Sequence, residues 1–201
     1  MMIKRLTNLT FLIAALLLLC TPSRSNAQDF AAKTNLLYDL TSTINIGAEA
    51  ALAPKWSLDI SGNMNFWSFS HGKRWKQWMI QPEARYWLCR NMGGHFFAAH
   101  ALGGQYNVGH VNLDFLSFLG DNFKEFKDFR HQGWFAGAGI GYGYSWILGK
   151  HWNLEAEIAV GYVYTRYDVY ECAGCGKKVD TDREKHYIGP TKAAINLVYV
   201  F

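Results

Sequence analysis

The sequence has no long apolar run after residue 27. No stretch of about 18 predominantly apolar residues, the length that a membrane-spanning helix requires, occurs in 28–201. Proline is scarce, with 4 residues among 201, whereas aromatic residues make up 16% of the chain and glycine contributes 19 residues. Because aromatic residues favour strands and glycine favours turns, this composition predicts an all-β chain.

The chain also lacks a strong charge of either sign. It carries 20 basic and 16 acidic residues, a formal net charge of +4 at pH 7. Without Lys4, Arg5 and Arg24 the balance becomes 17 basic against 16 acidic residues. A near-neutral balance gives no reason to expect nucleic acid as a partner.

Residues 1–27 are predicted to be a secretory signal peptide. Two basic residues near the start precede an apolar core at 11–19, and Ser-Asn-Ala at 25–27 has the small-x-small pattern of a cleavage site. We therefore expect one exported domain at 28–201. Export without a helical anchor leaves the periplasm, the exterior or a membrane barrel.

Alternation of apolar and polar residues dominates 28–201. Between Trp56 and Phe66 every second residue is apolar or glycine, whereas the residues between them are Ser, Asp or Asn. Successive side chains of a strand point to opposite faces, so this period predicts strands with one apolar and one polar face. The eight predicted strands are 33–38, 44–52, 56–66, 78–88, 95–108, 134–148, 154–165 and a last strand that includes 192–201.

Two of these strands contain residues that are unusual in a sheet. Pro82 has no N–H to donate to a neighbouring strand, so we expect a β-bulge at this position. In 134–148 one face carries Trp and Tyr, whereas the other is almost bare. We expect this bare face to leave room for long side chains from opposite strands; it consists of Gly137, Gly139, Gly141, Gly143 and Ser145.

Turn lengths distinguish the two ends of the predicted strands. Tight turns at Pro54, 91–93 and Gly149 alternate with longer polar connections. Bacterial outer-membrane barrels have an even strand number, short periplasmic turns and longer external loops. The sequence thus predicts an eight-stranded antiparallel transmembrane barrel with both termini in the periplasm. The alternative is a soluble secreted sandwich or lipocalin-like barrel, in which the face opposite the apolar one would be richly charged rather than small or polar.

The last ten residues carry a pattern of their own. Ala193, Ile195, Leu197, Tyr199 and Phe201 share one face, and the sequence stops on the aromatic residue. This pattern resembles the closing strand of outer-membrane barrels, in which the terminal aromatic residue is part of a signal. We therefore predict that Leu197, Tyr199 and Phe201 are read by the barrel assembly machinery.

The polar faces predict a network of charges inside the barrel. An eight-stranded barrel is only just wide enough for side chains, so lumenal charges must pair and we do not expect porin-like conduction. Because acids outnumber bases, some carboxyls are expected to be hydrogen-bonded or protonated, or water to fill part of the lumen. Acid–base catalysis or cation binding is the functional alternative. The predicted lumenal residues are Lys33, Glu49, Asp59, Glu83, Arg85, Glu155, Glu157 and Lys192.

Cys172 and Cys175 lie in the last predicted external loop. In an exported protein a disulfide between them is the first expectation. The alternative is half of a zinc site completed by His186 and by a histidine of another loop. A single C-x-x-C lacks the second pair that makes a zinc motif specific, and we expect no cofactor. The histidines of the other loops are His71, His110 and His131.

Several segments of 28–201 together form a recognisable set of motifs. They are KTNLLYD at 33–39, QPEARYWLC at 81–89, GHFF at 94–97, GGQYNVG at 103–109, GYGYSWIL at 141–148, WNLEAEI at 152–158, CxxCGKK at 172–178 and GPTKA at 189–193. These segments resemble one family of outer-membrane barrels typical of Bacteroidetes and catalogued as a domain of unknown function. The resemblance covers essentially all of 28–201 and implies a location and a fold, but no chemistry. It also suggests a surface or fimbrial protein as a partner.

These patterns predict a non-enzymatic outer-membrane barrel with a structural or surface-interaction role. Its loops, above all 110–131 and 169–186, would contact a partner protein or the lipid and lipopolysaccharide of the outer membrane. One alternative is an outer-leaflet lipid-modifying enzyme that uses His100 with Ser68 or Ser70, although no G-x-S-x-G motif surrounds these residues. The other alternative is a narrow channel.

Overall fold

The computed structural model describes residues 30–68, 74–109, 129–171 and 177–201. The predicted signal peptide and the Cys172–Cys175 pair lie outside these residues. The described part forms eight strands and a short helix: β1 (Phe30–Asn35), α2 (Leu36–Leu40), β2 (Ile44–Ala53), β3 (Trp56–Ser68), β4 (Arg74–Trp87), β5 (Gly94–Gly109), β6 (Arg130–Ile147), β7 (Trp152–Tyr170) and β8 (Lys178–Val200).

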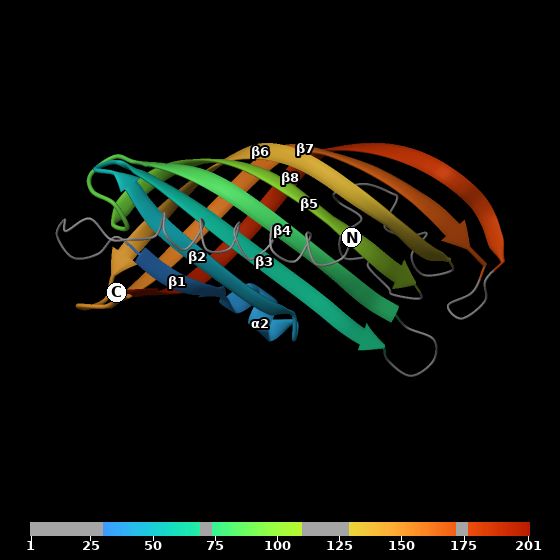
Figure 1. Cartoon of the computed structure of the whole chain (residues 1–201), viewed down its shortest axis with the longest axis horizontal. Coiled ribbons are helices and arrows are strands. Elements are labelled where there is room, and N and C mark those ends of the chain that lie inside the picture. Colours follow the sequence, from blue (N-terminus) through green and yellow to red (C-terminus); the bar gives the residue numbers. More distant parts are fainter. Residues whose placement is uncertain (1–29, 69–73, 110–128, 172–176) are drawn as a thin grey trace, which may run out of the picture.

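The strands form a closed barrel in which each strand pairs antiparallel with the next (Figure 1). The barrel closes between β1 and β8, where Ala31 lies opposite Val200 and Asn35 lies opposite Asn196. The predicted eight-stranded antiparallel fold is therefore confirmed. Closure leaves the first and last strands side by side, and the Phe201 N–H donates to the carbonyl oxygen of Phe30 at 3.0 Å.

The two ends of the barrel differ in their connections. Tight turns join β2 to β3, β4 to β5 and β6 to β7, and all three lie at the end that holds Phe201, which we call the turn end (Figure 1). The opposite end, called the loop end, is where the strands stop beside 69–73, 110–128 and 172–176. The alternation of short and long connections agrees with the prediction from the sequence.

Strand length increases around the barrel, from 6 residues in β1 to 23 in β8. Because β1 is short, β8 pairs with it only from Asn196 to Val200, whereas β8 pairs with β7 along most of its length. One side of the barrel is therefore tall and extends toward the loop end (Figure 1).

The first predicted strand is wrong in its second half. The alternation at 33–38 predicted a strand, but β1 ends at Asn35 and α2 begins at Leu36. The Asn35 side chain accepts a hydrogen bond from the Leu37 N–H at 3.1 Å, which is the bond an N-cap residue makes. This local cap outweighs the two-residue period of Leu36 and Tyr38. Within the described residues, no helix is long and apolar enough to cross a membrane.

The bulge predicted at Pro82 is also wrong. Ile80 pairs with Gly103 and Glu83 pairs with His100, so the β4–β5 register is the same on both sides of the proline. The sheet omits the two pairs between these positions and inserts no residue, because a proline lacks only its own N–H. The register does shift in β8, where Ala159 and Val160 of β7 face Lys192 and Pro190 and Thr191 is the additional residue.

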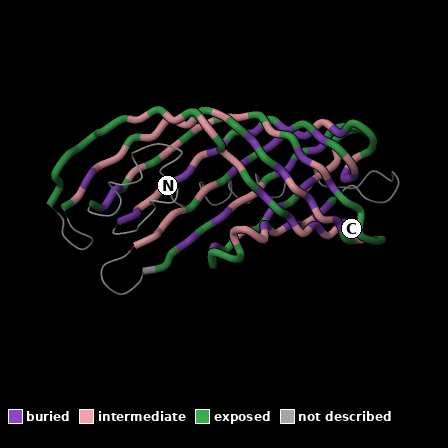
Figure 2. Tube along the Cα trace, turned by 180° about the vertical axis from the view of Figure 1, so that it is seen from behind, coloured by how far each residue is buried: buried purple, intermediate pink, exposed green. Residues whose placement is uncertain are grey.

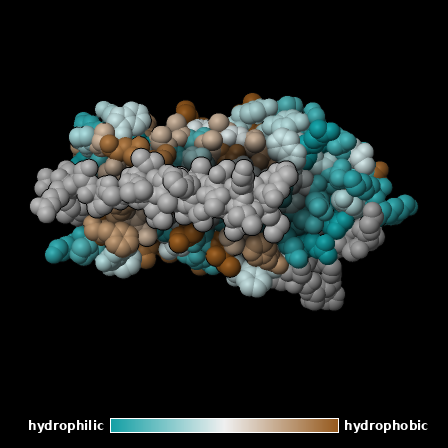
Figure 3. All heavy atoms as spheres, in the orientation of Figure 1, coloured by the Kyte–Doolittle hydropathy of each residue, from teal (hydrophilic) through white to brown (hydrophobic). Residues whose placement is uncertain are grey.

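Burial is the inverse of that in a water-soluble protein. Apolar side chains project outward on every strand, with Ile140 67% and Ile158 61% exposed, whereas the Glu155 side chain is fully buried. Figure 2 shows buried and exposed residues alternating along the strands, and Figure 3 shows hydrophobic side chains over the middle of the barrel and hydrophilic ones at the loop end. The interior is therefore polar over most of its height.

Seven of the buried apolar residues of the described part form two small clusters. One contains Ala31, Met92, Val198 and Val200, and the other contains Trp87, Phe96 and Ala98. All of these residues lie in the parts of their strands near the turn end or in a tight turn. The second cluster borders the charged interior, because the Arg85 guanidinium lies 4.5 Å from the centre of the Phe96 ring.

The bare inner face of β6 provides space for its immediate neighbours. A Cβ atom at Gly143 would overlap the Phe96 ring of β5, and one at Gly139 would lie 2.8 Å from the His100 ring of the same strand. The prediction that long side chains enter from opposite strands is therefore wrong. The space is used by β5, whose register places Phe96 opposite Gly143 and His100 opposite Gly139.

We expect Gly143→Ala to lower the free energy of unfolding by about 1–3 kcal/mol, the usual cost of overpacking. The new Cβ would meet the Phe96 ring and lie 2.8 Å from the Ala156 carbonyl oxygen. Urea titration of the refolded barrel, followed by tryptophan fluorescence, measures the change. Gly149→Ala is the control, because nothing lies within 4 Å of a Cβ at Gly149. Equal stability of the two variants would contradict the packing argument.

Candidate functional site

The structure brings all eight of the predicted lumenal charges together in the barrel interior. They come from six strands, and the register explains their meeting: Glu49 lies opposite Asp59, and Asp59 lies opposite Glu83. Three carboxylates of neighbouring strands thus lie side by side in one row. They repel one another unless cations lie between them. The cations are Lys33 of β1, Arg85 of β4 and Lys192 of β8.

Arg85 is the centre of this charge cluster. Its side chain is completely buried, and its planar guanidinium presents several N–H donors in fixed directions. The arginine therefore joins carboxylates that come from four different strands. Its ion pairs are Nε to Glu83 at 2.7 Å, Nη1 to Glu155 at 3.0 Å and to Glu49 at 3.1 Å, and Nη2 to Glu157 at 2.9 Å and to Asp59 at 3.5 Å.

The two lysines neutralise the two sides of the cluster. Lys33 Nζ contacts Glu49, Asp59 at 2.6 Å and Glu155 at 3.2 Å. Lys192 Nζ lies 2.7 Å from Glu83 and 2.9 Å from Glu157. Every carboxylate of the cluster therefore contacts at least one cation. Because each of the five carboxylates contacts both Arg85 and a lysine, the cluster is one connected network rather than separate pairs.

Neutral side chains complete the network, and the sequence analysis did not name them. Ser57 donates to Glu49, and the Asn196 side chain lies 3.5 Å from Glu155. Trp87 in turn donates to Ser57 at 2.8 Å, which links the charge cluster to the apolar residues near the turn end. Their position on the polar faces of the same strands could have identified them from the sequence.

A small cavity lies beside the cluster. Its volume is about 30 Å³, and it is lined by Lys33, Asp59, Gln81, Lys192 and Asn196 among others. This volume and its polar lining suit a single water molecule. Such a water would serve carboxylate oxygens that the protein leaves without hydrogen bonds, of which Asp59 Oδ1 is one within the described residues.

His100, the candidate for the enzyme hypothesis, faces the interior and is 4% exposed. Its Nε2 lies 3.1 Å from Thr191 Oγ1, and its Nδ1 lies 3.9 Å from Glu83 Oε2. Ser70 lies outside the described residues, as does the side chain of Ser68. His100 is therefore inaccessible from the outer face of the barrel, where the lipid-modifying hypothesis requires it.

The metal hypothesis has no support in the residues that are described. These residues contain no group of three or more His, Cys, Asp or Glu side chains that could hold a metal ion. His186 contacts Tyr162, where the imidazole and the phenol share a hydrogen bond. Whether Cys172 and Cys175 form a disulfide stays a prediction. Cys89 is free and exposed.

The predicted assembly signal lies at the turn end on the outer face. Leu197 and Tyr199 are half-buried among outward side chains, and Phe201 is exposed. The Tyr199 ring lies 5.0 Å from the Trp152 ring and 5.2 Å from the Phe201 ring, measured between centroids. The three aromatic side chains therefore form one surface beside the β1–β8 seam.

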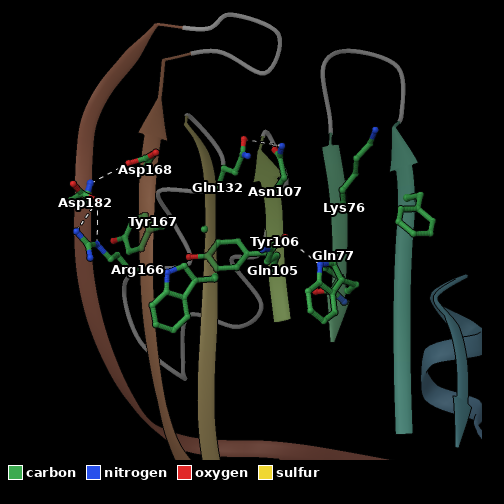
Figure 4. A pocket seen from close by; sticks show the side chains of 14 residues that line it. Lys76, Gln77, Gln105, Tyr106, Asn107, Gln132, Arg166, Tyr167, Asp168 and Asp182 are labelled. Atoms are coloured by element: carbon green, nitrogen blue, oxygen red, sulfur yellow. Dashed lines mark hydrogen bonds and ion pairs between the residues drawn. The ribbon is translucent and has the colours of Figure 1, made fainter. Parts of the chain in front are cut away.

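A second site was missed by the sequence analysis. A pocket of about 530 Å³ lies on the tall side of the barrel near the loop end, lined by residues of β3 to β8 (Figure 4). Figure 4 shows amide and tyrosine side chains of neighbouring strands gathered around it. Its lining combines aromatic rings and amides with the charged residues Lys76, Arg166, Asp168 and Asp182.

Comparisons with known proteins identify a family but no activity. A family model described as a protein of unknown function, DUF3575, matches residues 11–201. No curated protein and no solved structure matches the chain. The match covers nearly the whole sequence, including all eight strands.

Proposed function

The chain belongs to the DUF3575 family of proteins of unknown function, and from this premise we propose that it is an outer-membrane barrel with a sealed, charged interior and an interaction surface at its loop end. Its role in this proposal is structural or binding rather than enzymatic. Its partners would be outer-membrane lipid and lipopolysaccharide, and a surface or fimbrial protein. The barrel assembly machinery would insert it.

The observation that carries this proposal is the belt of exposed apolar side chains around the barrel. Monomeric soluble proteins rarely expose contiguous apolar patches larger than a few hundred Å². In lipid the same belt has no cost, and the barrel is closed by the pairing of β1 with β8 from Asn196 to Val200. Every strand contributes to the belt, with Phe30, Ile46, Ile60, Ile80, Phe97, Ile140, Ile158 and Ile195 as examples.

Strand length supports the same proposal. A membrane-spanning strand requires about 9–11 residues, and β2 has 10. The strands β4 to β8 are longer, so their ends at the loop end would extend beyond the membrane. The hydrophilic loop end in Figure 3 agrees with this placement.

The charge cluster supports a sealed interior rather than a channel. Arg85 and the carboxylates around it fill the barrel at the level of β4 and β7, and their side chains are almost completely inaccessible. An eight-stranded barrel is only just wide enough for its own side chains. The narrow-channel alternative therefore has no open path at this level.

Three measurements test the proposal together. We expect the purified protein to migrate differently in detergent gels before and after boiling, and to be recovered in the outer-membrane fraction. We also expect no single-channel steps in planar bilayers, because the charge cluster closes the lumen. Recovery in the soluble fraction without a gel shift would contradict the membrane proposal. Discrete conductance steps would contradict the sealed interior.

A further inference from the structure

Two of the tight turns at the turn end are fastened to each other by side chains. Asn91 of the β4–β5 turn donates to the Ala53 carbonyl oxygen of the β2–β3 turn at 2.5 Å. Lys55 Nζ of the β2–β3 turn donates to the Leu88 carbonyl oxygen at 3.1 Å. The two neighbouring turns therefore hold each other in fixed positions.

The β4–β5 turn is also tied to β6 and β7. The Met92 carbonyl oxygen accepts hydrogen bonds from Asn153 Nδ2 at 2.6 Å and from Ser145 Oγ at 3.3 Å. Met92 has a φ of 58°, in the left-handed region that residues other than glycine rarely adopt. Because two donors hold its carbonyl group, the turn keeps this conformation and the groups around it are preorganised.

A cavity of about 180 Å³ lies between the β4–β5 and β6–β7 turns. Its polar lining comes from Arg90, Asn91, Lys150 and Asn153. The volume exceeds what a single water molecule requires, so the cavity can hold a group of several heavy atoms. Gly149 also lines the cavity, and nothing lies within 4 Å of a Cβ at this position. We call this space the turn-end cavity.

The tight turns carry charged residues of one sign only. They contain Lys55, Arg90 and Lys150 but no aspartate or glutamate. Arg90 Nε and Ile147 Cδ1 lie 3.1 Å and 3.0 Å from the position of a Cβ at Gly93, so these two lining side chains are neighbours. Arg90 forms no ion pair with a carboxylate of the described residues. The turn-end cavity therefore has a guanidinium without a counter-ion in its wall.

This lining suits a phosphate group. A guanidinium presents parallel N–H donors that match two oxygens of a phosphate or a carboxylate. A phosphate has further oxygens for other donors. Asn91 and Asn153 each carry a second amide N–H besides the one that is used within the turns. A carboxylate, with two oxygens, satisfies fewer of these donors.

We propose that the turn-end cavity binds a phosphate group, with Arg90 as its principal ligand. Two sources carry this group at a membrane surface, a soluble phosphate ester and the head group of an anionic phospholipid. Both present the same oxygens to the guanidinium. The inference adds a binding site at the end of the barrel opposite the proposed interaction surface, and it does not depend on the proposed role of that surface.

Lys55 provides the matched control for Arg90. It is a cation at the same end of the barrel, but its ammonium group donates to the Leu88 carbonyl oxygen and it does not line the turn-end cavity. Gly149 provides a second position, because the open space around it admits a longer side chain. Glutamate at this position adds a negative charge to the cavity wall, whereas glutamine has nearly the same size without the charge.

The test is a titration of the refolded barrel in non-ionic detergent micelles, followed by phosphorus NMR. One arm uses glycerol phosphate and the other uses phosphatidylglycerol. We expect Arg90→Gln to weaken binding about tenfold, equivalent to about 1.4 kcal/mol, whereas Lys55→Gln stays within about twofold. Gly149→Glu should bind at least about threefold more weakly than Gly149→Gln. Acetate should compete at least about tenfold more weakly than inorganic phosphate.

Binding of glycerol phosphate with this pattern supports the site and shows that a soluble ester suffices, whereas binding of phosphatidylglycerol alone assigns the phosphate to a lipid head group. Binding in neither arm would overturn the inference. Equal losses for Arg90→Gln and Lys55→Gln would also overturn it, because they would indicate general attraction by the basic turns. Equal competition by acetate would contradict the choice of phosphate. The gel shift on boiling is measured for each variant, and the Gly149 pair decides the matter if Arg90→Gln fails to fold.

Discussion

Arg85→Met is expected to lower the free energy of unfolding by about 3–5 kcal/mol, the usual cost of removing one partner from a buried ion cluster. The arginine contacts five carboxylates, and Lys33 and Lys192 alone would then face them. Methionine preserves much of the side-chain volume, so the loss reports on charge rather than on a cavity. Urea titration of the barrel in lipid vesicles, followed by tryptophan fluorescence, measures the change.

Arg166→Met is the matched control for Arg85. Arg166 also contacts a carboxylate, Asp182 at 3.0 Å, but both side chains are exposed near the loop end. An exposed pair contributes at most about 1 kcal/mol. Glu155→Gln combined with Arg85→Met should recover part of the lost stability, because it removes one of the uncompensated charges. Equal losses for the two arginine variants would contradict a central role of the buried cluster.

Ile140→Lys is expected to destabilise the barrel in lipid vesicles by about 2–4 kcal/mol, the cost of a lysine facing lipid at the bilayer midplane. Ile140 projects outward near the middle of β6 and is 67% exposed. In a soluble barrel the same change would place a lysine in water and would alter stability by no more than about 0.5 kcal/mol. The expected loss of stability thus differs by several kcal/mol between a lipid and a water environment. Equilibrium unfolding in urea measures this loss.

Leu148→Lys is the control for this prediction. Leu148 is 62% exposed, nearly as much as Ile140, but it follows β6 at the turn end. A lysine near the membrane surface costs only about 0–1 kcal/mol, because its ammonium group reaches water. We therefore expect Ile140→Lys to destabilise the barrel much more than Leu148→Lys, because the cost of a lysine depends on its depth in the membrane. A flat profile, with both changes near zero, would indicate that the belt faces water.

Much of the fold could be predicted because alternation is a local property of a strand. In Trp56–Phe66 the residue types alone separate the outward face from the inward face, and the structure has this segment within β3. The predicted strand features were wrong where another local effect competed with the two-residue period of a strand. Asn35 caps a helix in the middle of an alternating segment. At Pro82 the sheet omits two pairs and keeps its register.

The charged residues of the interior could likewise be named from their strand faces, but their contacts could not. Lys33 and Glu155 are 122 residues apart in sequence, and Lys192 and Glu83 are 109 apart. Nothing local indicates that Arg85 rather than a lysine lies at the centre. The loop-end pocket was missed for a related reason. Its amides and tryptophans come from neighbouring strands and resemble ordinary surface residues when each strand is considered alone.

The sequence by itself determined which side chains face inward and outward, because that choice depends only on the two-residue period of a strand and on the polarity of each residue. Only the tertiary structure decided which inward charges meet. Pairing across a barrel depends on the register of all eight strands and on the closure of β1 against β8, and a shift of one residue would invert a whole face. The β4–β5 and β5–β6 registers likewise place Trp78, Gln105 and Trp134 in one row.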